Sequence, residues 1–241
     1  MISRAPRPVR VGVSACLLGD AVRYDGGHKR DAILLHRLGP LVEWVKVCPE
    51  VESGMGTPRE PIRLVNRDGR VRLLAVKSGA DHTTPMAAYA ARRLTELARE
   101  DLCGYVLKQD SPSCGMRDVK VHNAGGSTTR SGVGAFAAAL LARFPDLPVE
   151  DEGRLADAAR REHFIERIFA YRRLRDLFEG RWTVAGLLRF HTAHTLVLTA
   201  HSAAACRALS RLVARAASLP RADVRAQYRA AFMQALAVPR H

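Results

Sequence analysis

The amino-acid sequence predicts an α/β protein, with a mostly parallel, Rossmann-like sheet covered by helices and an all-helical C-terminal extension. Three observations predict this class. Short apolar runs alternate with helical patterns up to about residue 150, which is typical of parallel strands joined by crossover helices. Glycine and proline separate these segments. Beyond residue 150, apolar residues recur mainly with helical spacing.

The part of the chain before residue 150 contains six segments with the pattern of a strand. The predicted strands span residues 9–15, 42–47, 62–65, 71–76, 104–108 and 147–150. The third and fourth should form a hairpin, because Asp68-Gly69 between them is a strong turn signal. The predicted helices span residues 31–38, 83–101 and 135–144, the first with Asp31 as its N-cap. Glycine and proline predict loops over residues 53–61 and 125–134.

The C-terminal part is predicted to be helical over residues 153–179, 183–217 and 221–236. These patterns divide the chain into an α/β domain at 1–152, a helical connection at 153–180 and a helical segment at 181–241.

Composition limits the class of protein. No apolar run reaches the roughly 18–20 residues of a membrane span, and the N-terminus lacks the apolar core of a signal peptide, so we expect a cytoplasmic protein with reduced thiols. The net charge of +14 is spread over the chain, with +6 in residues 1–150 and +8 in residues 151–241. The even spread favours solvated basic faces over a nucleic-acid-binding tract.

Three cysteines carry the strongest functional signal. Cys16, Cys48 and Cys114 each follow a predicted buried strand or lie in the loop after it. Because ligands gather at the carboxyl ends of parallel strands, we expect these thiols to converge, and three thiolates can hold an iron–sulfur cluster while leaving one iron free. The alternative is that they are small buried residues that fill strand ends. Cys103 and Cys206 are assigned to packing.

Several motifs around these cysteines occur in a specific order. They are Ser-Ala-Cys-Leu-Leu-Gly (14–19), Val-Arg-Tyr-Asp-Gly-Gly-His-Lys (22–29), Cys-Pro-Glu-Val (48–51), Thr-Pro-Arg-Glu-Pro (57–61), Leu-Lys-x-x-Ser-Pro-Ser-Cys-Gly (107–115) and Gly-Val-Gly-Ala-Phe-Ala (132–137). Over about residues 8–150 the chain resembles the thiouracil desulfurase family, also known as domain of unknown function 523. The tail from Trp182 onward more weakly resembles the start of a YbgA-like helical domain, domain of unknown function 1722.

The resemblance implies a [4Fe-4S] cluster held by Cys16, Cys48 and Cys114, with no protein ligand on the fourth iron. It also implies a non-redox desulfuration, in which thiouracil becomes uracil and hydrosulfide leaves, with iron acting as a Lewis acid on the soft sulfur. Glu50 is the expected proton-transfer group and Ser111 the second catalytic residue.

Further residues are candidates for substrate binding. Ser113 is the alternative to Ser111 at the reacting centre, and turn formation around the intervening proline is the structural alternative for both serines. The glycine-rich loop with Gly132 and Gly134 precedes a helix and is a candidate anion cradle, although a flexible connection is an equal alternative. A substrate phosphate could instead contact a basic side chain, with Lys29, Arg59 and Lys108 as candidates.

In the tail, three histidines fall on one predicted helix face. His191, His194 and His201 have a spacing that metal sites use, but amphipathic helices of this kind usually pack, so we favour packing or a partner contact.

The sequence therefore predicts an iron–sulfur enzyme acting on a small thiolated pyrimidine, whether base, nucleoside or nucleotide, with no membrane partner. Two alternatives remain: cluster-dependent sulfur handling on tRNA, and a basic nucleic-acid-binding module without enzymatic activity. Nothing in the sequence predicts an oligomeric state.

Overall fold

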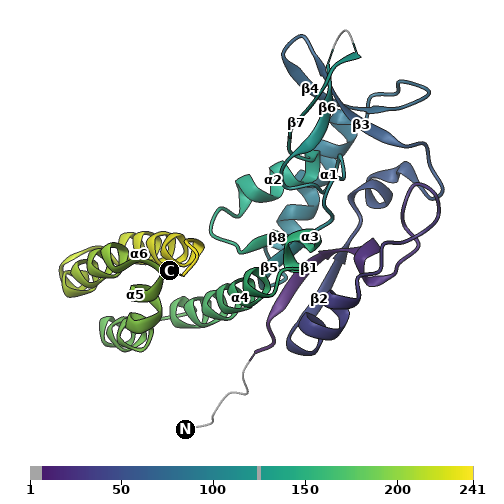
Figure 1. The fold of residues 1–241 in the computed structure, drawn as a ribbon. Coiled ribbons are helices and arrows are strands. Elements are labelled where there is room, and N and C mark those ends of the chain that lie inside the picture. The colour runs from purple at the N-terminus through teal and green to yellow at the C-terminus, as the bar shows by residue number, and fades with distance from the viewer. Residues whose placement is uncertain (1–6, 124–125, 241) are drawn as a thin grey trace. The chain divides into compact units, whose positions relative to one another are not determined.

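A computed structural model describes residues 7–123 and 126–240 and is drawn in Figure 1. Two compact units make up the chain. The first comprises Met1–Pro145 and Val149–Phe164, and the second comprises Asp146–Pro148 and Ile165–His241. The sequence-based division at residues 152 and 180 stays a prediction. No described helix combines the length and apolar character needed to cross a membrane.

The first unit is built on a four-stranded parallel sheet in the order β2-β1-β5-β8. The strands are β1 (Arg10–Ser14), β2 (Glu43–Val47), β5 (Leu102–Leu107) and β8 (Val149–Asp151). Every residue of β5 is buried, as expected of an apolar strand inside a parallel sheet covered on both faces. The predicted fold class is confirmed.

A second, mixed sheet has the order β4-β3-β6-β7. Its strands are β3 (Ile62–Arg67), β4 (Arg70–Ala75), β6 (Val119–His122) and β7 (Thr128–Gly132). The predicted hairpin is confirmed, with Asp68 and Gly69 at φ values of +53° and +77° in the turn between β3 and β4. Figure 1 shows these four strands together in the part of the first unit that carries the hairpin loops.

The predicted loop over 125–134 is wrong for Thr128–Gly132, which pair antiparallel with β6. β7 is an edge strand whose first four residues are exposed, so it carries no apolar alternation that would reveal it. β6 was not predicted, because only four residues separate the turn-rich segments on either side of it. Residues 124–125 lie outside the described ranges.

Helices of the first unit lie near their predicted positions. α1 (Thr83–Leu97) ends four residues before the predicted end, α2 (Ala135–Arg143) ends one residue early, and α3 (Glu152–Leu155) follows β8. The predicted N-cap is confirmed, because Asp31 Oδ1 accepts a 2.8 Å hydrogen bond from the Leu34 amide. The turn that follows is π-helical over Leu34–Leu38.

One predicted loop begins with regular structure. A π-helical turn occupies Val51–Met55, so the loop expected over residues 53–61 begins only after Met55. Gly54 adopts a φ of +97° inside this turn, a conformation that glycine tolerates without steric cost.

α4 (Ala158–Phe178) continues into the second unit, which also contains α5 (Val184–Ala214) and α6 (Arg221–Ala237). α5 departs from helical geometry at Ser202, where φ is −162° and ψ is 101°. α5 and α6 pack against each other around buried side chains that include Tyr228 and Phe232.

Candidate functional site

The three cysteines line one pocket of about 330 Å³ at the carboxyl ends of the parallel sheet. Cys16 follows β1, Cys48 follows β2, and Cys114 lies in the loop after β5. Strand register explains the convergence, because β1 pairs in parallel with both β2 and β5 and all three end at the same edge.

Most of the predicted site residues lie at this pocket. Besides the three cysteines, its lining includes six further candidates, namely Lys29, Glu50, Arg59, Lys108, Ser111 and Ser113. Gly132 and Gly134 are not part of its lining. The pocket therefore gathers the predicted thiols, the carboxylate, both hydroxyls and all three basic side chains.

Burial makes all three thiols weaker acids than an ordinary cysteine. It raises the pKa of Cys16 to about 11, with the neighbouring Cys48 adding to the effect. Burial likewise raises the pKa of Cys48, and it raises that of Cys114 to about 12, with Glu50 adding to the shift. Cys48 contributes to the raised pKa of Cys16, and Cys16 contributes to the raised pKa of Cys114, so the three thiols lie in one electrostatic environment.

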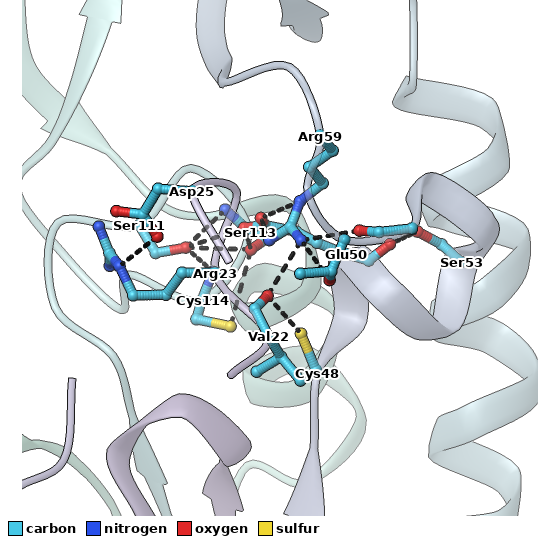
Figure 2. A network of polar contacts seen from close by, with 12 residues as sticks. Val22, Arg23, Asp25, Cys48, Glu50, Ser53, Arg59, Ser111, Ser113 and Cys114 are labelled. Carbon is cyan, nitrogen blue, oxygen red and sulfur yellow. Dashed lines mark hydrogen bonds and ion pairs between the residues drawn. The ribbon is translucent and has the colours of Figure 1, made fainter. Parts of the chain in front are cut away.

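Glu50 is the centre of a polar network beside the cysteines (Figure 2). Arg59 donates to Glu50 Oε2 through Nη2 and, at 3.0 Å, through Nε. Ser113 Oγ donates to Glu50 Oε1 at 2.5 Å. Arg59 also donates to the carbonyls of Val22 and Gly56, both at 3.0 Å. The Arg59 guanidinium, predicted as a phosphate contact, is thus engaged in holding the Glu50 carboxylate.

Both serines of the Ser-Pro-Ser-Cys-Gly motif face the Glu50 network. Ser111 Oγ lies 3.0 Å from Ser113 Oγ and 3.5 Å from Glu50 Oε1. Ser111 Oγ also accepts from the amides of Ser113 and Cys114 at 3.2 and 3.1 Å, so it closes the turn as well. Ser113 is fully buried whereas Ser111 is half-buried. The turn role and the site role therefore coexist in Ser111.

The two lysines at the pocket differ in whether their ammonium groups are free to bind an anion. Lys108 forms an ion pair with the buried Glu152, whose other oxygen accepts from the Gln109 amide at 2.8 Å. Lys29 is exposed at the pocket, and among the described residues its ammonium makes no hydrogen bond or ion pair, although its charge is one of the causes that lower the pKa of Asp25. Lys29 is therefore the basic side chain best placed to meet an anionic group.

The two predicted glycines have structural roles beside the pocket. A Cβ on Gly134 would lie 2.6 Å from the carbonyl group of Ser113, and the Gly134 amide donates to the Gly115 carbonyl at 2.7 Å. A Cβ on Gly132 would lie 2.6 Å from the side chain of Val121. Gly134 thus permits the close approach of α2 to the Cys114 loop.

Ser14 was missed by sequence reasoning. It is the last residue of β1, is almost fully buried and lines the pocket. Its Oγ accepts from the Lys108 amide at 3.0 Å, and its hydrogen bond to Cys114 lowers the pKa of that thiol. Its position two residues before Cys16, at the end of a buried strand, was the available signal.

The chemistry of the donor set suits an iron–sulfur cluster. Over residues 7–123 and 126–240, no three His, Cys, Asp or Glu side chains close on a point as a mononuclear site requires. All five cysteines are free thiols, and the three at the pocket are the soft ligands that iron–sulfur clusters use.

The protein-family model of 2-thiouracil desulfurase matches residues 11–152, which is more than half of the chain. The chain belongs to this family. The match begins in β1 and ends in α3, so it contains every residue of the pocket.

One curated protein and one solved structure are similar to this chain. An uncharacterized protein of Bacillus subtilis (strain 168), YbbK, is 33% identical over 108 residues, which cover 43% of this chain and 71% of YbbK. The solved structure of TudS, described as a [4Fe-4S]-dependent thiouracil desulfidase, has a TM-score of 0.51 and 32% identity. The alignment covers 64% of this chain and 97% of TudS.

The tail lies beyond the matched family model, and its resemblance to a YbgA-like domain stays a prediction. Its three histidines are buried and have separate partners. His191 contacts Tyr228 Oη at 3.0 Å, and His201 contacts Glu166 at 2.9 Å. His194 Nδ1 lies 2.8 Å from the Phe190 carbonyl. These contacts support the packing interpretation.

Proposed function

We propose that this protein is an iron–sulfur desulfurase that converts thiouracil, or a nucleoside or nucleotide of it, to the uracil form with release of hydrosulfide. Cys16, Cys48 and Cys114 would hold a [4Fe-4S] cluster. The observation that carries the proposal is the convergence of three free thiols and the Glu50 carboxylate on one pocket of a 2-thiouracil desulfurase family member. The description of TudS supports the same cofactor and substrate class.

The overall reaction consumes one water. The carbon–sulfur double bond is replaced by a carbon–oxygen double bond, and sulfur leaves as hydrosulfide, so no electrons are gained or lost. When bound, the cluster supplies a soft Lewis-acid iron without a protein ligand for the thiocarbonyl sulfur. The chain must supply proton transfer and orientation of the ring.

Glu50 is the residue we assign to proton transfer. Its Oε1 is directed toward the two serine hydroxyls, and a carboxylate there can accept a proton from the water that adds to the ring carbon. Arg59 holds the other carboxylate oxygen, Oε2, with two N–H donors, so Oε1 is the oxygen assigned to proton transfer. Arg59 is therefore a positioning residue in this proposal.

Ser111 and Ser113 have different roles beside the Glu50 carboxylate in this proposal. Ser113 is buried and orients Glu50 Oε1, whereas the half-buried Ser111 can contact a water molecule or the substrate. Lys29, exposed at the pocket rim, is assigned to a phosphate where the substrate is a nucleotide.

Turnover of thiolated pyrimidines tests the proposal. The protein, reconstituted anaerobically, is incubated with 2-thiouracil, 4-thiouracil, their nucleosides and monophosphates, and a thiolated RNA. Hydrosulfide and the loss of thiocarbonyl absorbance are followed. Glu50→Gln is expected to lower kcat by about 10²–10⁴-fold. Glu43→Gln is the matched control, since Glu43 is exposed and pairs with Arg10 away from the pocket lining.

A cluster-loaded protein that turns over none of the small substrates contradicts the proposal. Turnover restricted to thiolated RNA would establish the tRNA alternative instead.

A further inference from the structure

We propose that Tyr89 and Glu52 form a positioning tie that fixes the Cys48 ligand loop against the Cys114 ligand loop. The inference rests on the proposed function and assigns residues that lie outside the pocket lining. It starts from a buried tyrosine hydroxyl and a carboxylate that the reaction itself does not use.

Glu52 holds Cys48 from two directions. The Cys48 amide donates to Glu52 Oε1 at 2.7 Å, and the Glu52 amide donates back to the Cys48 carbonyl at 2.9 Å. These reciprocal bonds close the start of the π-helical turn over Val51–Met55. The position of the Cys48 backbone therefore depends on the orientation of the Glu52 carboxylate.

Tyr89 sets that orientation. It projects from α1, is 3% exposed, and its Oη donates to Glu52 Oε2 at 2.7 Å. Arg93, one helical turn further along α1, places its Nε 3.4 Å from the same oxygen. The two Glu52 oxygens therefore have different partners. Oε1 accepts from the Cys48 amide, and Oε2 contacts Tyr89 and Arg93 of α1.

Tyr89 is also linked to the Cys114 loop, through Phe136 of α2. Its ring lies 6.0 Å from that of Phe136 between centroids. Phe136 is fully buried near the start of α2, and its amide donates to the Ser113 carbonyl at 3.0 Å. Tyr89 therefore links the two loops, directly by its hydrogen bond to Glu52 and indirectly by packing against Phe136, whose amide is bonded to the Cys114 loop.

The consequence concerns ligand geometry. Residues that orient metal ligands from outside the site commonly change metal affinity by about 10–100-fold when removed. Tyr89→Phe keeps the ring packed on Phe136 and removes only the hydroxyl that anchors Glu52. Glu52→Ala removes the bond to the Cys48 amide itself. Both should loosen the Cys48 ligand while leaving the rest of the first unit folded.

Two measurements test the tie, one on each form of the full chain. On the reconstituted protein, cluster loss to an iron chelator is timed by the fall in visible absorbance, and the electron paramagnetic resonance of the reduced cluster is recorded. On the cluster-free protein, hydrogen exchange is measured over residues 48–53. Tyr228→Phe is the matched control, because it removes another buried tyrosine hydroxyl, bonded to His191, in the second unit.

We expect Tyr89→Phe and Glu52→Ala to speed cluster loss about 10-fold or more and to accelerate exchange over residues 48–53, with Tyr228→Phe unchanged in both. Wild-type rates in both variants, or an equal effect of Tyr228→Phe, would overturn the inference. Faster exchange with unchanged cluster loss would overturn the role in ligand positioning. A wild-type chain that takes up no iron refutes the proposed function, and exchange in the cluster-free chain then decides whether the tie exists.

Discussion

Replacing Arg59 with methionine should destabilise the first unit severely. The side chains of Arg59 and Glu50 are only 6% and 14% exposed, so Arg59→Met leaves the Glu50 carboxylate without its counter-charge in a largely buried place. It also removes the donor to the Val22 and Gly56 carbonyls. Methionine keeps most of the side-chain volume, which confines the perturbation to charge and hydrogen bonding.

Breaking one partner of a buried ion pair costs about 3–5 kcal/mol, whereas an exposed pair is worth about 0–1 kcal/mol. The Arg59–Glu50 pair belongs to the first class by exposure. The matched control is Arg72→Met, because Arg72 pairs with Asp81 at 2.8 Å with side chains 45% and 38% exposed. We therefore expect a loss of about 3–5 kcal/mol for Arg59→Met and at most about 1 kcal/mol for Arg72→Met.

The two tryptophans allow the first unit to be followed alone. Trp44 lies in β2 and Trp182 in the second unit, so in a Trp182→Phe background urea unfolding monitored by fluorescence reports the first unit. Combining Arg59→Met with Glu50→Gln should recover about 2–3 kcal/mol, because the unpaired charge is then removed as well. A loss below about 1 kcal/mol for Arg59→Met, or strictly additive effects in the double variant, would refute the reasoning.

Two further predictions concern the second unit and the Cys114 loop. Burial lowers the pKa of His191 and His194 below their ordinary value of 6.5, so the unfolded chain binds protons more readily and stability is full above that value. Unfolding followed by Trp182 fluorescence in a Trp44→Phe background should show stability falling as pH drops from 7.5 to 5.5; a flat profile would contradict this. Gly134→Ala should cost about 1–3 kcal/mol, because its Cβ would meet the Ser113 carbonyl at 2.6 Å. Gly39→Ala, whose nearest contact is 3.5 Å, should be mild in the same urea assay, and equal effects would refute the steric argument.

The parallel sheet and its cysteines could be predicted from sequence because the signals are local. A run such as Leu102–Leu107 is continuously apolar, and such runs belong to buried parallel strands. Cysteines placed just after these runs, or in the loops that follow them, are expected at the carboxyl edge of the sheet. Their convergence on one pocket follows from topology more than from any single contact.

The missed features depend on contacts between distant residues. β7 is recognisable only through its pairing with β6, since its exposed sequence has no periodicity. Likewise, two ion pairs determine which basic groups are already neutralised by a carboxylate. They join Arg59 to Glu50 and Lys108 to Glu152, residues 9 and 44 positions apart in the sequence. A list of basic residues gives no indication of which ones have partners.

The central claim is that Cys16, Cys48 and Cys114 hold a [4Fe-4S] cluster, and iron and acid-labile sulfide content after anaerobic purification tests it most directly. Single alanine variants at these positions are compared with Cys103→Ala and Cys206→Ala, whose thiols do not line the pocket. The account predicts about four iron and four sulfide per wild-type chain, loss in the three pocket variants and retention in the two controls. Iron absent from the wild type after reconstitution, or retained in the pocket variants, would contradict it.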